Sequence, residues 1–172
     1  MSENNKLGLA KASNTWRLGA DWKIGNRSWP HPARLYSLGM GILYTTLGIA
    51  GFFRASGLTS RNFWGTNFLI NGPHDVYHLV IGILGFAAYR VGREFQYARA
   101  MSVIFSFLSI AGFLSQPTFG LMTLNGGDIF LHGLTAIIGD GVCRVEVDEK
   151  LEAEVTALRS ELDEVEARPG GD

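Results

Sequence analysis

The apolar residues of the chain gather in four blocks separated by short polar segments. Residues 35–53 contain 19 consecutive uncharged positions, about 28 Å as a helix, which matches a hydrocarbon core of roughly 30 Å. The third block, residues 100–116, lies inside a charge-free stretch that continues to residue 127. Residues 71–89 and 125–143 are similar in length but carry ionisable side chains near their starts. This pattern predicts an all-α membrane protein whose four transmembrane helices form a bundle.

The fourth block is the weakest of the four. Only 11 uncharged residues separate Asp128 from Asp140, so a helix lying against the other three remains an alternative to a span. If residues 125–143 do cross, Asp140 lies near one rim, where Arg144 can pair with it across one helical turn.

Charge is distributed unevenly, although the formal net charge is only −1. Residues 1–34 carry six Lys/Arg and two Asp/Glu, whereas residues 144–172 carry four and ten. We therefore expect a basic head with tryptophans, a transmembrane domain over residues 35–143 and an acidic tail. One cysteine and no basic excess outside the head exclude a disulfide scaffold and a nucleic-acid partner.

The lysines and arginines predict the orientation. Most of them lie in the head, in the 90–99 turn and at the start of the tail, whereas the opposite loops carry only Arg54 and Arg61. The positive-inside rule then places both termini in the cytoplasm of a multi-pass cell-membrane protein.

An internal duplication relates the two halves of the predicted bundle. Residues 47–53 (LGIAGFF) match residues 108–114 (LSIAGFL), and the motif N-G-x-[HD]-x-x-x-H occurs at residues 71–78 and again at residues 125–132. Each copy is a two-helix hairpin, so the copies should be related by an axis along the membrane normal. Neither hairpin can surround a core alone, which predicts that the two pack together.

These motifs and the four-span layout resemble the bacterial membrane proteins grouped as domain of unknown function 4383. The resemblance covers roughly residues 33–143. It implies a four-span membrane fold and no established activity, and it extends to neither the head nor the tail.

The repeated motif contains the candidate functional residues of the chain. Four-residue spacing puts His74 with His78, and Asp128 with His132, on one helix face. Small residues continue each stripe and mark close helix packing, while the asparagines fit helix N-caps. The packing residues are Gly82, Gly85, Ala136 and Gly139, and the capping residues are Asn71 and Asn125.

Several interpretations of the motif remain open. In the structural one, the asparagines cap helices and the imidazoles bond across helices or to the loops, with no cofactor. In the second, His74, His78, Asp128 and His132 hold zinc or copper. In the third, His78 and His132 are axial ligands to a haem or chlorin. A relay for protons or small solutes, using the same residues with Asp140, is a fourth.

Nothing in the chain predicts catalysis. It contains no G-x-S-x-G, H-E-x-x-H, P-loop or G-x-G-x-x-G motif. We therefore expect a non-enzymatic membrane component that acts through helix packing and association, with a metal- or haem-binding protein as the alternative.

Head and tail differ in kind. Trp16, Trp22 and Trp29 among basic residues suit the lipid headgroup level, or equally a flexible lead-in covering the base of the bundle. Residues 168–172 are expected to be disordered. The tail repeats apolar residues at spacings of 4, 3, 4 and 3, which predicts a coiled-coil helix that joins copies of the chain or docks a membrane-complex partner. These residues are Leu151, Val155, Leu158, Leu162 and Val165. A solvated amphipathic helix, or one that folds back on the basic head, is the alternative.

Overall fold

The computed structural model describes residues 22–24, 27–54, 57, 61–63, 68–114, 122 and 124–167, with side chains from residue 30 onward. Trp16 and residues 168–172, on which expectations were placed, lie outside this part of the chain.

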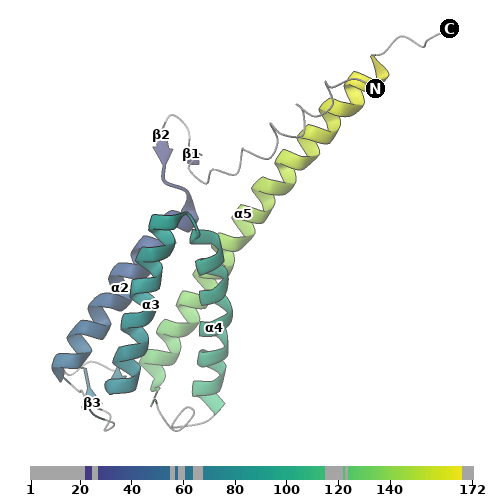
Figure 1. Cartoon of the computed structure of the whole chain (residues 1–172). Coiled ribbons are helices and arrows are strands. Elements are labelled where there is room, and N and C mark those ends of the chain that lie inside the picture. The colour runs from purple at the N-terminus through teal and green to yellow at the C-terminus, as the bar shows by residue number, and fades with distance from the viewer. Residues whose placement is uncertain are drawn as a thin grey trace, which may run out of the picture.

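Four helices make up the fold within the described residues: α2 (Pro32–Arg54), α3 (Gly72–Val91), α4 (Glu94–Leu114) and α5 (Gly126–Glu166). Helices α2 and α3 pack as one hairpin, and α4 and α5 pack as another. Figure 1 shows the two hairpins side by side, with α5 continuing far past the ends of the other three helices. The all-α class and the pairing of hairpins are confirmed.

Two helix boundaries differ from the predicted ones. Helix α4 begins at Glu94, because Gly92 takes a left-handed φ of 70° and ends α3 with a tight turn. Helix α5 does not stop at residue 143 but runs for 41 residues, about 61 Å. No Gly or Pro interrupts residues 142–167, so the predicted fourth span and the tail share one helix.

Two small antiparallel pairs of strands flank the helices. Before α2, β1 (Trp22–Ile24) pairs with β2 (Arg27–Trp29), with Trp22 opposite Trp29. At the other end of the bundle, β3 (Arg61–Asn62) pairs with β4 (Leu69–Ile70), immediately before α3. The second pair holds the chain against the start of α3, where the first motif lies.

The duplication seen in the sequence recurs as symmetric contacts between the hairpins. The hydroxyl of Tyr36 donates to the carbonyl of Thr135, and that of Tyr97 donates to the carbonyl of Ile81. Both tyrosines lie eleven residues before their LxIAGF segments, and both acceptors lie three residues after the last histidine of their motifs. The two bonds are therefore equivalent and exchanged between the copies, which is what a two-fold relation requires.

Close helix contacts follow the same symmetry. A Cβ at Gly85 would lie 2.8 Å from the carbonyl oxygen of Ser37, and a Cβ at Gly139 would lie 3.0 Å from that of Ala98. Ser37 and Ala98 are equivalent positions of the two copies. In both hairpins, a glycine lets the second helix approach the backbone of the first.

We predict that Tyr36→Phe and Tyr97→Phe each lower the free energy of unfolding by about 1 kcal/mol, since each removes one buried hydrogen bond. Unfolding in mixed detergent micelles measures the loss. Tyr89→Phe is the control, because its ring keeps the contact with the Arg34 guanidinium, 4.7 Å from the ring centre. A loss confined to one of the two tyrosines would contradict their equivalence.

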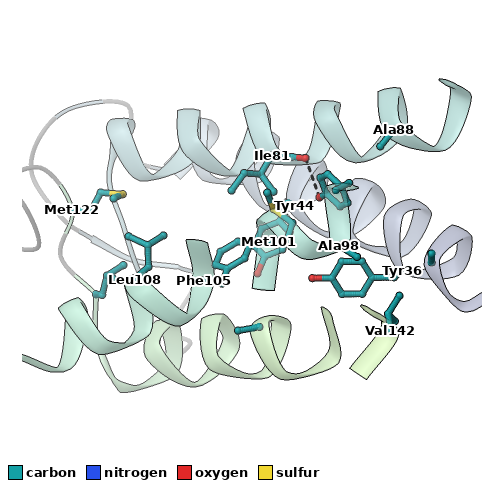
Figure 2. Close-up of a cluster of buried hydrophobic side chains, with 14 residues drawn as sticks. Tyr36, Tyr44, Ile81, Ala88, Ala98, Met101, Phe105, Leu108, Met122 and Val142 are labelled. Atoms are coloured by element: carbon teal, nitrogen blue, oxygen red, sulfur yellow. Dashed lines mark hydrogen bonds between the residues drawn. The ribbon is translucent and has the colours of Figure 1, made fainter. Parts of the chain in front are cut away.

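Large apolar side chains face outward and polar ones face inward. Phe53, Phe113 and Ile137 are 85%, 80% and 71% exposed, whereas His74 and Asp75 are fully buried. Figure 2 shows the aromatic part of the core, where Tyr44 and Phe105 lie between the helices. Among the described residues, α2 and α4 are long and apolar enough to cross a membrane. Helices α3 and α5 carry ionisable side chains in their first turns, which lowers their apolar content.

Candidate functional site

Helices α3 and α5 begin with equivalent caps. Asn71 is the N-cap of α3, and its side chain accepts a hydrogen bond from the His74 N–H at 3.0 Å. Asn125 is the N-cap of α5 and accepts from the Asp128 N–H at 3.2 Å, while the Asp128 carboxylate accepts from the Asn125 N–H at 3.1 Å. The caps fix where each helix starts and therefore which way its motif side chains face.

Three histidines from the two motifs meet between the hairpins. The rings of His74 and His78 lie 4.4 Å apart between centres, and that of His132 lies 5.9 Å and 6.0 Å from them. One nitrogen from each ring falls within 4.8 Å of the others. All three residues are at most 3% exposed. Residues more than fifty positions apart thus form one buried nitrogen cluster, which we call the histidine cluster.

Only one of the six ring nitrogens has a hydrogen-bond partner within the described residues. His74 Nδ1 lies 3.0 Å from the carbonyl oxygen of Leu69, and because a carbonyl only accepts, Nδ1 carries the hydrogen. His74 Nε2 then has a free lone pair. Both nitrogens of His78 and both of His132 are buried without a partner. An unsatisfied buried polar group costs about 1–3 kcal/mol, so a ligand that binds one nitrogen of each ring would stabilise the cluster.

Aromatic rings fix the histidines from the side of α2 and α4. Tyr44 lies 5.1 Å from His78, and the equivalent Phe105 lies 4.8 Å from His132, between ring centres. The rings of Tyr44 and Phe105 stack on each other at 5.0 Å, and the Tyr44 hydroxyl is 2.7 Å from the Thr135 hydroxyl. Sequence analysis did not single out this pair. The sequence does contain a signal for the pair, because each of the two aromatic residues lies three positions before an LxIAGF segment.

Asp128, the equivalent of His74, is not part of the histidine cluster. Its Oδ2 accepts hydrogen bonds from the backbone N–H groups of Asn125 and Leu69, each at 3.1 Å. Leu69 thus joins the two motifs, because its N–H bonds to Asp128 and its carbonyl to His74. Of the four predicted ligand residues, the structure brings the three histidines together and holds the carboxylate at the helix start.

Asp75 is a buried acid that sequence analysis did not name as a site residue. It is 0% exposed, and neither carboxylate oxygen has a hydrogen-bond partner within the described residues. A Cβ at Gly51 would overlap its carboxylate, so glycine makes the space that the acid fills. In the second copy, Ile129 occupies the equivalent place beside Gly112. The only sequence signal was a charged residue within an apolar block.

The predicted packing residues lie at helix contacts. A Cβ at Gly82 would clash with the backbone of Thr45, and the contacts of Gly85 and Gly139 are described above. Ala136, the equivalent of Gly82, is 4% exposed. The stripe of small residues is therefore the surface along which α3 and α5 meet their neighbours.

The predicted tail residues face outward. The first turns beyond residue 143 still contact the bundle, because buried Glu146 lies 3.6 Å from His31 and the Lys150 ammonium lies 4.7 Å from the ring centre of Phe95 on α4. The exposed Arg144 donates a hydrogen bond to the Asp140 carboxylate, which raises the pKa of the Arg144 guanidinium. Beyond Lys150, the apolar stripe lies on the surface. Its members Leu151, Val155, Leu158, Leu162 and Val165 are 39–62% exposed.

A small pocket reaches the histidine cluster from the end of the bundle that carries β3 and β4. His78 and Asp128 form its polar wall, and its apolar wall comes from Leu47, Phe63, Phe68, Ile70 and Leu131. Its inner space has room for about one water molecule.

The model of the family described as domain of unknown function (DUF4383) matches residues 34–143. This range contains the histidine cluster, all of α3 and α4, most of α2 and the first part of α5. No curated protein and no solved structure matches the chain.

Proposed function

Because the chain belongs to the DUF4383 family, whose function is unknown, we propose its function from its own geometry: it is a four-span membrane protein that binds a transition-metal ion at the histidine cluster. The two parts of this proposal, the bilayer and the metal, rest on different observations.

The outward faces of all four helices support four spans. Helices α3 and α5 expose large apolar side chains as α2 and α4 do. Examples that are 50–71% exposed are Ile83, Leu84, Phe130 and Ile137. An aqueous surface does not explain such faces on every side, whereas acyl chains would cover them. Since His74, Asp75, His78, Asp128 and His132 are all buried, these ionisable groups need not contact lipid.

The orientation follows from the same arrangement. The base of the bundle, where α2 and α4 begin and where the tail leaves, carries most lysines and arginines, including Arg34, Arg90, Arg93 and Arg99. We place this end and both termini in the cytoplasm. The end with β3, β4 and the histidine cluster then lies toward the outer face of the membrane.

The single observation that carries the metal proposal is the set of five buried, unpartnered imidazole nitrogens. Neutral imidazole binds zinc, copper, iron and nickel. A metal-bound histidine commonly donates its other N–H to a backbone carbonyl, as His74 does to Leu69. A tetrahedral site with metal–nitrogen distances of about 2.1 Å needs nitrogens about 3.4 Å apart. The three ligand nitrogens lie within 4.8 Å of one another, so metal binding would bring them closer together.

The geometry favours an ion over the other interpretations. A haem between His78 and His132 would need room for a macrocycle, whereas Phe105 packs on His132 and the adjoining pocket holds about one water. In the described structure, hydrogen bonds account for only one of the six ring nitrogens, and that bond joins His74 to Leu69 of β4, not to another helix. We propose a binding role for this metal centre, in a membrane component that is not an enzyme.

Metal titration tests the proposal. Protein purified in detergent and stripped with a chelator should bind one Co²⁺ per chain and develop the visible absorption of a cobalt ion with nitrogen ligands. Zn²⁺ should then bleach this absorption by displacing cobalt. The proposal would be contradicted if the protein became saturated with Co²⁺ without any visible band. It would also be contradicted if the protein bound Co²⁺ no more tightly than the detergent buffer alone does.

The tail supports a second role, association with another copy of the chain. The heptad spacing places Val155 at an a position and Leu151 and Leu158 at d positions, a combination that favours parallel pairs. Two copies in one membrane present their tails on the same side and in parallel. Glu154 and Arg159 then occupy g and e positions, where they can pair between the helices.

We predict that Leu158→Glu weakens self-association of the full-length protein by about tenfold or more, since it places a charge in the apolar seam. Ser160→Glu, on the opposite side of the helix, is the matched control and should leave association unchanged. Cross-linking in membranes and light scattering in detergent measure the self-association of both variants. Equal association of both variants with the unaltered protein would rule out this role of the tail.

A further inference from the structure

The histidine cluster offers three nitrogen ligands, one fewer than a four-coordinate ion needs. We propose that the bound metal keeps an open coordination position, which a water molecule fills from the pocket beside His78. This inference rests on the metal binding proposed above and makes the centre an open site.

The described part of the chain supplies no fourth ligand to the cluster. Among the described residues, the only group of three or more His, Cys, Asp or Glu ligand atoms that lie together is that of His74, His78 and His132. Asp128 is the nearest candidate by sequence, but two backbone N–H groups hold its Oδ2 at the start of α5. Moving this carboxylate to the metal would break the capping box and the link to Leu69. The fourth ligand is therefore expected to come from outside the chain.

The pocket lies where that ligand would have to enter. It reaches His78 on one side and Asp128 on another, and its remaining walls are apolar. Because it holds about one water molecule, its size selects water over larger donors. The carboxylate of Asp128 disfavours a second anion there, but it can accept a hydrogen bond from a metal-bound water. Size and charge thus select the same ligand.

Hyperfine broadening by ¹⁷O tests this inference on the full-length protein loaded with Co²⁺. The low-temperature electron paramagnetic resonance signal of the cobalt should broaden when the solvent is exchanged for H₂¹⁷O. Leu131→Phe, which fills the pocket, should bind Co²⁺ but lose the broadening. Leu134→Phe, at a position on the same helix that is 42% exposed, is the matched control and should keep it.

The outcomes separate this inference from the proposed function. A protein that binds no cobalt contradicts the proposed function itself. A protein that binds cobalt with no ¹⁷O broadening keeps the metal site and overturns the open position. Broadening that persists in Leu131→Phe overturns the pocket as the source of the water. If Leu131→Phe does not fold, Leu47→Phe fills the same pocket from α2 and gives the same test.

Discussion

Replacing His78 with leucine should abolish the tight binding of Co²⁺ and leave the metal-free protein at least as stable as before. Loss of an outer partner of a metal ligand costs about 10- to 100-fold in affinity, and loss of a ligand itself should cost at least as much. Both ring nitrogens of His78 are buried without a partner in the described structure. An apolar side chain there removes two unsatisfied groups and breaks no hydrogen bond.

This variant separates the metal interpretation from a purely structural one. A histidine that held helices together by hydrogen bonds would lower the free energy of unfolding when replaced, whereas one reserved for a metal would not. Cobalt titration and unfolding of the metal-free protein in mixed micelles measure the two effects. His31→Leu is the control, because His31 lies outside the cluster with its Nε2 3.0 Å from Glu149. Unchanged cobalt affinity in His78→Leu would exclude the histidine cluster as the site.

Replacing Gly85 with leucine should destabilise the bundle by at least about 3 kcal/mol, at the upper end of the usual cost of overpacking. A Cβ at this position would lie 2.8 Å from the Ser37 carbonyl oxygen and 3.0 Å from the Cα of Gly41. Both contacts are with backbone, which cannot rotate away as a side chain would. The hairpin of α2 and α3 must therefore open to accept the new side chain.

Gly141→Leu is the matched control for this prediction, since nothing lies within 4 Å of a Cβ at Gly141 and that residue faces outward. Both substitutions add the same atoms to a helix and improve its intrinsic propensity. Unfolding in mixed micelles and the yield of folded protein should therefore differ only through packing. Equal stability of the two variants would show that α3 does not approach α2 along Gly85.

The equivalence of the two hairpins links these results. Gly85 and Gly139 make equivalent contacts, as do Tyr36 and Tyr97, so each hairpin is built by the same rules. The copies differ where the site lies, because Asp128 stands where the first copy has His74. The symmetric parts build the bundle, and the asymmetric part decides which side chains remain free to bind a ligand.

Sequence alone determined the hairpins, their duplication and the placement of the motif asparagines before two helices. These features depend on local periodicity and on residues a few positions apart, which a linear pattern records directly. Tertiary structure decided the rest. It joined both motifs through Leu69 and left Asp128 outside the group formed by His74, His78 and His132. The reason is physical, because those outcomes depend on hydrogen bonds and packing between segments more than fifty residues apart, which no local spacing can specify.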